Sequence, residues 1–154
     1  MTQNRQKTQK PRLYIAYGSN LNLNQMAGRC PTSEMIGATF LRNWRLRFRG
    51  EYRRAVATIE RQKGCRVPVL VWKLQPEDEQ ALDIYEGFPY LYRKQTLRIT
   101  LDGERINAFT YIMNEFRHPY NKPSIGYLSI VREGYRNAKF DTDFLRRAVE
   151  QNSR

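Results

Sequence analysis

The stretch RLYIAYGSN, residues 12–20, decides the fold of this chain. Residues 12–17 are rich in apolar, β-branched and aromatic side chains, which predicts a buried strand. The strand stops at Gly18, and a helical pattern runs from Leu21 to Arg29. A strand, a tight turn and a helix start leave backbone N–H groups unpaired, so we expect a pocket for a carboxylate, a phosphate or an oxyanion. An ordinary strand-to-helix connection is the alternative. The glycine patterns of P-loops and dinucleotide sites are absent, which argues against a nucleotide pocket.

Length and composition indicate one basic domain with a substantial core. The chain has 154 residues and a net charge of +12. Residues 1–11 are polar and basic without an apolar segment, so we expect a disordered tail and no secretory signal, followed by a single domain over residues 12–154. No apolar run is long enough to span a bilayer. The two cysteines, Cys30 and Cys65, are too few for a zinc site, so we expect reduced thiols, no metal and a cytoplasmic location.

Arginines are densest in residues 42–54, where part of the sequence alternates between apolar and basic side chains. The alternating residues are Trp44, Arg45, Leu46, Arg47, Phe48 and Arg49. A period of two predicts a strand with a buried apolar face and a solvated arginine face. A nucleic-acid surface is the alternative, but the motifs of known nucleic-acid-binding folds are absent. We therefore expect only weak and nonspecific nucleic-acid binding.

The rest of the chain contains strand patterns separated by turn and helix signals. Strands are expected at 36–41, 44–49, 55–60, 65–74, 92–101 and 106–113, with turns at Lys63-Gly64 and Asp102-Gly103. Pro68 favours an edge or bulge position. Helices are expected from Pro76 to Glu86, from Pro123 and after Asp141. The succession predicts an α+β fold with a small, curved, mostly antiparallel sheet or β-barrel and flanking helices.

Glu86 is a carboxylate in an unfavourable position. It ends a helix before Gly87, so it faces the negative end of the helix dipole at a cost of about 0.3–1 kcal/mol. The expected apolar face of this helix consists of Ala81, Leu82, Ile84 and Tyr85. The aromatic neighbours of Glu86 in sequence are Tyr85, Phe88, Tyr90 and Tyr92. If Glu86 points inward among them, its pKa rises toward the range of a neutral-pH proton shuttle; an exposed last-turn glutamate is the alternative.

Three short motifs occur in an order that is specific when they are taken together. They are YGSNL at 17–21, YEG at 85–87 and PSxxY at 123–127. The chain from residue 12 onward thereby resembles the gamma-glutamylcyclotransferase family. The resemblance implies a small β-barrel with flanking helices and a cavity between them. It also implies release of 5-oxoproline from a γ-glutamyl compound without a metal or a cofactor.

The resemblance assigns roles to individual residues. Glu86 matches the catalytic acid/base of the family. The matching substrate-binding residues are Tyr17, Gly18, Ser19, Asn20, Leu21, Tyr92, Tyr111 and Tyr127. Pro68 departs from the pattern, because members often have glycine there. IAYGSN at 15–20 also differs from the form found in glutathione-specific relatives, which makes glutathione a less expected substrate.

The leading hypothesis is a cytoplasmic γ-glutamyl cyclotransferase that acts on a small molecule with an undetermined leaving group, with a monomer favoured. Attack of the substrate's own α-amine on its γ-carbonyl needs a proton carrier and no enzyme nucleophile. A basic nucleic-acid-associated protein without catalysis is one alternative, and the period-two arginines argue against it. A cyclotransferase fold retained as a binding module is another, and the intact Glu86 argues against it. The hypothesis requires that Glu86 and residues 18–21 line one cavity.

Overall fold

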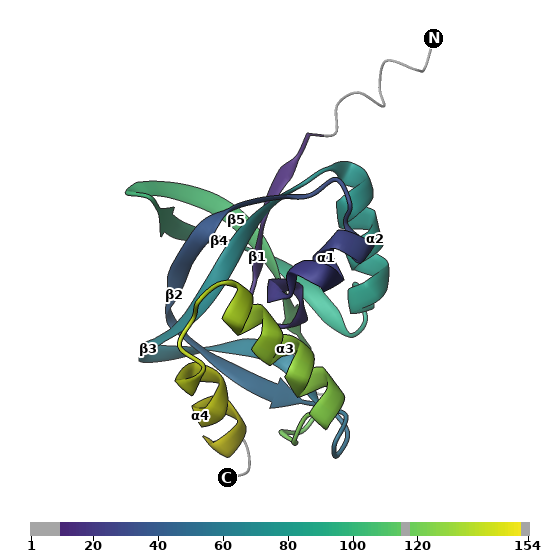
Figure 1. Cartoon of the computed structure of the whole chain (residues 1–154), viewed down its shortest axis with the longest axis vertical. Helices are drawn as coiled ribbons and strands as arrows, with labels where there is room; N and C mark the ends of the chain where they lie inside the picture. The colour runs from purple at the N-terminus through teal and green to yellow at the C-terminus, as the bar shows by residue number, and fades with distance from the viewer. Residues whose placement is uncertain (1–9, 115–117, 152–154) are drawn as a thin grey trace.

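Five strands form one curved sheet in the order β2-β3-β1-β5-β4 (Figure 1). This computed structural model describes residues 10–114 and 118–151. The strands are β1 (Arg12–Ala16), β2 (Glu34–Arg49), β3 (Val56–Leu74), β4 (Tyr92–Leu101) and β5 (Glu104–Met113). Neighbouring strands are antiparallel except β1 and β5, which are parallel. The tail expected over residues 1–11 falls almost entirely outside the described residues and stays a prediction.

The expected α+β fold with a curved, mostly antiparallel sheet is confirmed, but the sheet is not closed into a barrel. Its edge strands, β2 and β4, approach each other where Thr39 Oγ1 donates to the carbonyl of Thr100 at 2.7 Å. Leu101 packs close to Gly37 at the same place. Closure of a barrel requires a continuous ladder of backbone hydrogen bonds, whereas here a side chain joins the two edges.

β2 and β3 form one long hairpin, which corrects the four shorter strands expected from the sequence. Arg42 pairs with Arg66 and Trp44 pairs with Arg61, so residues 62–65 of β3 stand opposite Asn43 alone. Asn43 Oδ1 accepts the amide proton of Gly64 at 3.1 Å. In place of the expected Lys63-Gly64 turn, β3 therefore has a β-bulge of several residues, which bends the strand without reversing the chain.

Two other turn and strand predictions agree with the structure. Asp102 and Gly103 both have positive φ angles, 50° and 82°, and join β4 to β5 in a two-residue hairpin turn. Pro68 pairs with β2, but β1 ends opposite Leu70. At Pro68 the strand β3 therefore has a ladder neighbour on one side only, which suits a residue without an amide proton.

The prediction of a solvated arginine face on β2 is wrong. The apolar residues of the alternation are buried as expected: Trp44, Leu46 and Phe48. Arg47, however, is only 7% exposed, because the Tyr120 ring covers it with its centroid 3.7 Å from the guanidinium carbon. Arg49 lies 3.9 Å from the same ring and pairs with Glu60, which also accepts the Tyr120 hydroxyl proton. A segment far along the chain supplies this cover, so local periodicity could not reveal it.

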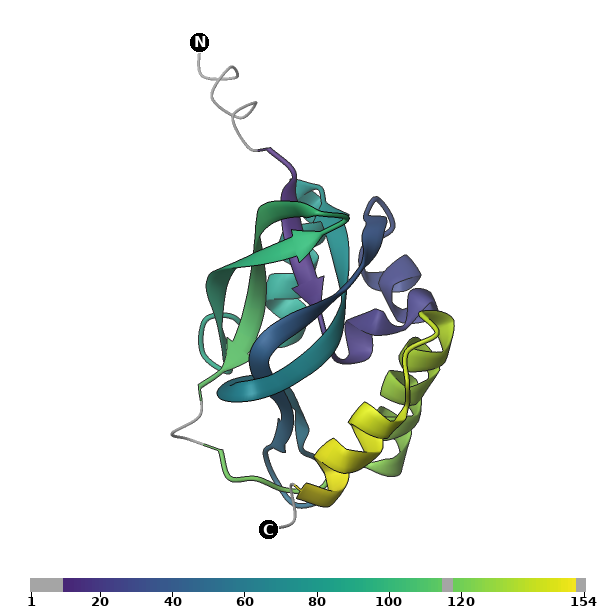
Figure 2. The same cartoon turned by 90° about the vertical axis from the view of Figure 1, so that its left-hand side faces the viewer.

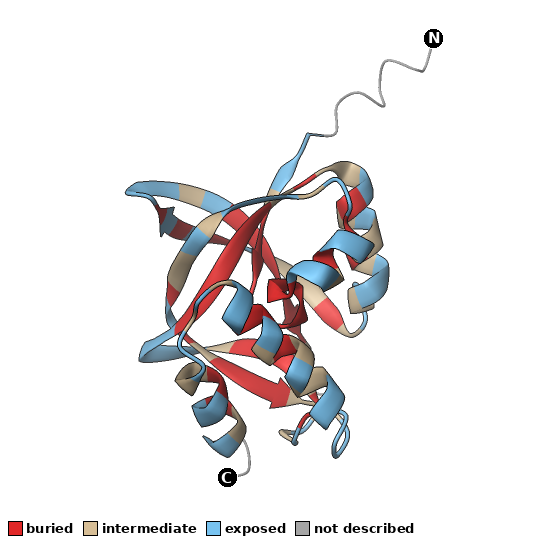
Figure 3. Cartoon of the chain, viewed as in Figure 1, coloured by how far each residue is buried: buried red, intermediate tan, exposed pale blue. Residues whose placement is uncertain are grey.

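The helices pack beside the sheet in two groups, with α1 next to α2 and α3 followed by α4 (Figures 1 and 2). They are the 3-10 helix η2 (Ser19–Leu21), α1 (Leu23–Arg29), α2 (Pro76–Glu86), α3 (Ile125–Asn137) and α4 (Asp143–Gln151). The helix expected over Leu21–Arg29 is divided, because Asn22 caps α1 by accepting the amide proton of Gln25. Figure 3 shows buried residues on the strands and on the helix surfaces turned toward them.

The apolar face predicted for α2 is mostly wrong. Ile84 is 84% exposed, and Tyr85 is also exposed. Leu82 is fully buried as expected. The side of α2 that faces the sheet instead carries charged residues, and ion pairs with β4 attach much of this helix to the sheet.

Lys94 of β4 provides this attachment for α2. Its Nζ lies 2.6 Å from Glu79 Oε2 and 2.8 Å from Asp83 Oδ1. Asp83 also accepts the hydroxyl proton of Tyr111 at 2.6 Å. Residues three and four apart share a helix face, so the spacing of Glu79, Asp83 and Glu86 turns Glu86 toward the sheet as well.

A close contact fixes α3 against η2. A Cβ atom at Gly134 would lie 2.7 Å from Leu21 Cβ and 2.8 Å from the backbone of Leu21 and Asn22. Two hydrogen bonds flank this contact, from Asn22 Nδ2 to the carbonyl of Ile130 and from the amide of Leu23 to Asn137 Oδ1, both at 3.1 Å. The turn after β1 and the helix α3 therefore have a fixed relative position.

Gly134→Ala should destabilise the fold by about 1–3 kcal/mol, because the added methyl group has backbone against it and overpacking outweighs the gain in helix propensity. Gly126→Ala is the matched control on the same helix, since nothing lies within 4 Å of its added Cβ. We expect this control to be as stable as the wild type or more so. Denaturant unfolding measures both variants, and equal stability of the two would contradict the contact.

Candidate active site

A cavity of about 200 Å³ lies where η2, the end of α2 and the start of α3 meet the sheet. It is lined by Tyr14, Tyr17, Gly18, Ser19, Asn20, Val56, Ala57, Tyr85, Glu86, Leu91, Tyr92, Tyr111 and Tyr127. Glu86 and residues 18–20 thus share one cavity although they are far apart in sequence. Of the residues to which the resemblance assigned a catalytic or substrate-binding role, all but Leu21 line it.

Leu21 is the exception and corrects the sequence-based assignment. Its side chain is fully buried beneath Gly134 and belongs to the core rather than to the cavity lining. Its amide donates to the carbonyl of Gly18 at 3.0 Å and closes the 3-10 turn. Leu21 therefore supports the turn from behind and does not line the cavity.

The turn offers fewer open amides than the sequence suggests. The amides of Leu21 and Asn22 bond to the carbonyls of Gly18 and Ser19. Ser19 and Asn20 are the first two residues of the 3-10 helix, so their amides have no intrahelical acceptor. Two cavity-lining residues consequently supply the amides that are able to bind an anion.

Glu86 has an environment that favours its neutral form. Burial raises the pKa of Glu86 from 4.5 to about 7, and the positive charge of Arg29 opposes part of that rise. Burial, and to a lesser extent the charge of Glu86, raise the pKa values of Tyr14, Tyr17 and Tyr127. The carboxylate therefore lies among hydroxyl groups near the point of half-ionisation at neutral pH.

The aromatic residues around Glu86 differ in part from those expected. Tyr90 is 79% exposed and does not line the cavity, and Phe88 is also outside the lining. Tyr85 and Tyr92 do line it. Gly87 has a positive φ and turns the chain away directly after the helix. The other tyrosines of the lining come from β1 and the residue that follows it, from β5 and from α3.

Three of the cavity tyrosines use their hydroxyl protons within the protein. Tyr17 donates to the carbonyl of Tyr111 at 2.5 Å, and Tyr92 donates to the carbonyl of Ala57 at 2.6 Å. Tyr111 donates to Asp83. These three side chains form the cavity wall and keep only acceptor capacity for a ligand.

Two other tyrosines keep their protons available. The Tyr14 hydroxyl accepts from Asn20 Nδ2 at 2.9 Å, and the Tyr127 hydroxyl accepts from the amide of Ala57 at 3.0 Å. Within the residues that the structure describes, neither hydroxyl proton has an acceptor. Tyr14 was missed from the sequence because it reads as an ordinary core residue of the first strand. Both hydroxyls are able to donate to an oxyanion or a carboxylate.

Arg29 is a second residue that the sequence did not identify as part of the site. Its guanidinium donates to Asn20 Oδ1 at 2.6 Å and to Ser19 Oγ at 3.2 Å. It also stacks on the Tyr85 ring, 3.6 Å from the centroid. Arg29 thereby ties the turn to the end of α2, a long-range contact for which the sequence carries no local signal.

Other kinds of site were sought in the described ranges. Over residues 10–114 and 118–151, no group of three His, Cys, Asp or Glu side chains is placed to hold a metal ion. No helix in these same ranges has the length and apolar character needed to cross a membrane.

The motifs around the cavity agree with a comparison of the whole chain with known families. A family model described as "Gamma-glutamyl cyclotransferase, AIG2-like" matches residues 14–133, which include Glu86, the turn and Tyr127. The chain belongs to this family. Membership of the family explains why the YGSNL and YEG motifs, which lie far apart in the sequence, meet at one cavity.

Individual relatives support the family and the fold. A human gamma-glutamylcyclotransferase is 28% identical over 131 residues, which cover 79% of this chain and 69% of the relative. A solved gamma-glutamyl cyclotransferase superposes with a TM-score of 0.79 at 24% identity, covering 90% of this chain and 86% of that one. YkqA from Bacillus subtilis superposes with a TM-score of 0.78 at 16% identity, covering 98% of this chain and 57% of YkqA. The two structural likenesses establish the fold.

Glu86→Gln should raise stability at pH 8 and leave it nearly unchanged at pH 4. The folded state holds the proton of Glu86 up to a pKa of about 7 against an ordinary value of 4.5. Ionisation therefore costs stability as the pH rises from 4.5 to 7, and the full cost is present above 7. Glutamine removes this cost. Thermal unfolding at both pH values measures the difference. Glu104→Gln, at an exposed glutamate, is the control and should show no such dependence on pH. Lower stability of Glu86→Gln than of the wild type at pH 8 would contradict burial of the charge.

Proposed function

We propose that the protein is a γ-glutamyl cyclotransferase that releases 5-oxoproline and a free amine or amino acid from a γ-glutamyl compound. The observation that carries the proposal is the Glu86 carboxylate, whose pKa is raised to about 7 in a cavity shared with the Ser19–Asn20 turn. Membership of the family and the similarity to a human gamma-glutamylcyclotransferase support it. The two free cysteines favour the cytoplasm as its location.

The proposed reaction is an intramolecular acyl transfer. The substrate's α-amine attacks its own γ-carbonyl carbon, a C–N bond forms to close a five-membered ring, and the bond from that carbon to the leaving nitrogen breaks. A folded substrate supplies the nucleophile at an effective concentration of about 10⁵ M or more. The protein has to hold this folded form, move one proton and stabilise the oxyanion.

Glu86 is suited to moving the proton. The α-amine of the substrate has a pKa of about 8 and is mostly protonated at neutral pH, so a base must first remove one proton. The Glu86 carboxylate accepts that proton and then donates it to the departing nitrogen. The attacking nitrogen releases a second proton to solvent as the ring closes, and the freed amine takes one up from solvent. A pKa near 7 lets one group perform both steps, a contribution of about 10²–10⁴-fold.

The hydroxyl and amide donors are suited to the substrate's negative charges. The cavity lining contains one carboxylate and no lysine or arginine. We therefore assign recognition of the α-carboxylate and of the oxyanion to the amides of Ser19 and Asn20 and to the hydroxyls of Tyr14 and Tyr127. Such fixed donors are most effective where water is excluded.

The size of the cavity suggests which part of the substrate it encloses. Its volume of about 200 Å³ is below the roughly 300–1,000 Å³ of typical ligand pockets. The glutamyl part is small enough to occupy it, which leaves the amine part at the open side. A panel of γ-glutamyl amino acids and γ-glutamyl amines, assayed for 5-oxoproline, would identify the leaving group.

Glu86→Gln should reduce kcat for 5-oxoproline release by about 10²–10⁴-fold while substrate still binds, because the amide cannot accept the ammonium proton. In the wild type, kcat/KM should rise with pH through an apparent pKa of about 7. Glu104→Gln, an exposed glutamate on β5, is the matched control and should retain wild-type kinetics. Release at most of the wild-type rate by Glu86→Gln would exclude this residue as the proton carrier. No product from any member of the panel would favour the binding-module or nucleic-acid alternatives.

Tyr14→Phe should lower kcat/KM by about tenfold, because it removes a hydroxyl proton available to the substrate, and loss of one oxyanion donor costs that much or more. Tyr90→Phe, at an exposed tyrosine outside the cavity, should leave kinetics unchanged. Initial rates over a range of substrate concentrations compare the two variants. An unaltered kcat/KM in a folded Tyr14→Phe protein would remove Tyr14 from the proposed donors.

A further inference from the structure

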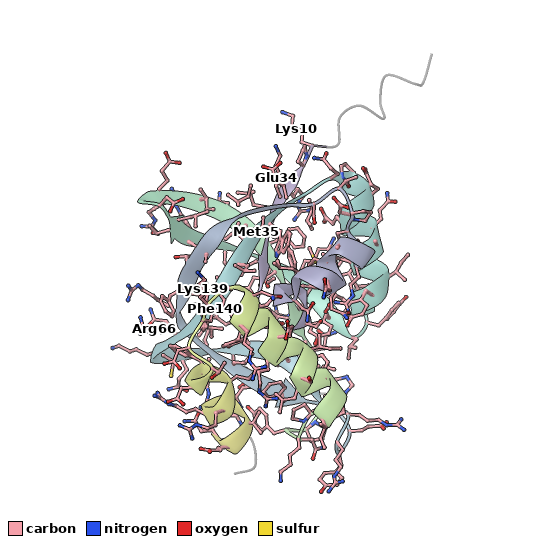
Figure 4. All side chains as sticks on the ribbon, viewed as in Figure 1. Lys10, Glu34, Met35, Arg66, Lys139 and Phe140 are labelled. Atoms are coloured by element: carbon pink, nitrogen blue, oxygen red, sulfur yellow. The ribbon has the colours of Figure 1, made fainter. Side chains whose placement is uncertain are left out.

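A second cavity, of about 380 Å³, lies between the β2–β3 hairpin and α4. It shares no lining residue with the candidate active site. Figure 4 labels Arg66 on the side of the molecule where β3 lies near the α3–α4 connection, which carries Lys139 and Phe140. Neither the family motifs nor the proposed reaction uses this region.

Three arginines from different elements line this second cavity: Arg45 on β2, Arg66 on β3 and Arg147 on α4. The guanidinium of Arg66 stacks over the Phe40 ring, 4.0 Å from its centroid. Stacking fixes the guanidinium plane and leaves its N–H edge free for an acceptor. Arg45 also donates to Gln151 at 3.1 Å and Arg147 pairs with Asp143, so Arg66 is the guanidinium most available to a ligand. Guanidinium groups from three elements around one cavity favour an oxyanion as the ligand.

The carboxylates in the second cavity are already engaged. Asp141 Oδ1 accepts the amide proton of Asp143, and the Asp143 carboxylate pairs with Arg146 and Arg147 at 3.1 and 3.3 Å. In the described part of the chain, no carboxylate lies within ion-pair distance of Arg66. The acids therefore organise the start of α4 and do not neutralise the hairpin side of the cavity.

The lining of the second cavity combines polar and apolar side chains in similar measure. Val67, Phe144 and Ala148 contribute apolar surface. Tyr135 also lines the cavity and is fully buried, and its hydroxyl has no hydrogen-bond partner among the described residues. The Tyr135 hydroxyl is itself sealed from the cavity, so the groups available to a ligand are the arginines and the apolar side chains.

We propose that this cavity binds a small organic oxyanion, a carboxylate or a phosphate on a compact aromatic or apolar body. Arg45, Arg66 and Arg147 bind the oxyanion. The apolar body packs on Phe144. Both oxyanions match the planar guanidinium, so the choice between them is made by experiment.

Titration of the full chain with phenyl phosphate and with benzoate, followed by amide NMR shifts, tests the proposal. We expect saturable binding of at least one probe with a Kd of about 1 mM or tighter, with shifts at residues that line the second cavity. The stronger probe identifies the oxyanion. Benzylamine, with the same ring and the opposite charge, should not bind there. No saturable shifts, shifts confined to the candidate active site, or equal binding of benzylamine would overturn the proposal.

Variants separate a built site from general attraction to a basic protein. Arg66→Gln should weaken binding about fivefold or more, whereas Arg105→Gln, which removes an exposed arginine on β5, should not. Tyr135→Phe, which removes a hydroxyl that is sealed from the cavity, should leave binding unchanged. Glu86→Gln should leave binding unchanged, so failure of the proposed enzymatic function would not affect this result. Equal loss in Arg105→Gln, or no loss in Arg66→Gln, would refute the site.

Discussion

The contact between Gly134 and Leu21 is the constraint on which the candidate site depends. The absence of a side chain at Gly134 lets α3 lie directly on the turn that follows β1. This position brings Tyr127 to the cavity, where its hydroxyl accepts the amide proton of Ala57. The turn that α3 contacts carries Ser19 and Asn20, which line the cavity. One close backbone approach thus aligns three segments that are distant in sequence.

The placement of Glu86 depends on polar attachment rather than on an apolar helix face. Lys94 holds Glu79 and Asp83 of α2 against the sheet, and Glu86 lies one turn further along that face. The helix ends there, so its dipole and the surrounding burial both disfavour the charged carboxylate. Arg29 limits this effect while it ties the turn to Tyr85. The resulting pKa of about 7 is the property that makes the cavity suited to proton transfer.

Local signals in the sequence predicted a large part of the fold and of the candidate site. The Asp102-Gly103 turn, the end of α2 at Gly87 and the strand before Gly18 all follow from backbone preferences that act over a few residues. Predictions based on periodicity were weaker. Arg47 was expected in solvent and is covered by Tyr120, and Ile84 was expected to be buried and is exposed. In both cases a partner from another part of the chain decides the environment of the side chain.

The sequence by itself determined the α+β class, the family motifs and the identity of Glu86 as the unusual carboxylate, because each is encoded within a short stretch. Only the tertiary structure decided that Tyr14 lines the cavity, that Arg29 braces the turn and Tyr85 at its edge, that Leu21 is not in the lining, and that the sheet stays open. Those features depend on which hydroxyl protons are already used, on how closely two backbones approach, and on whether two sheet edges meet. Such properties arise from contacts between residues far apart in the chain, and no local pattern specifies them.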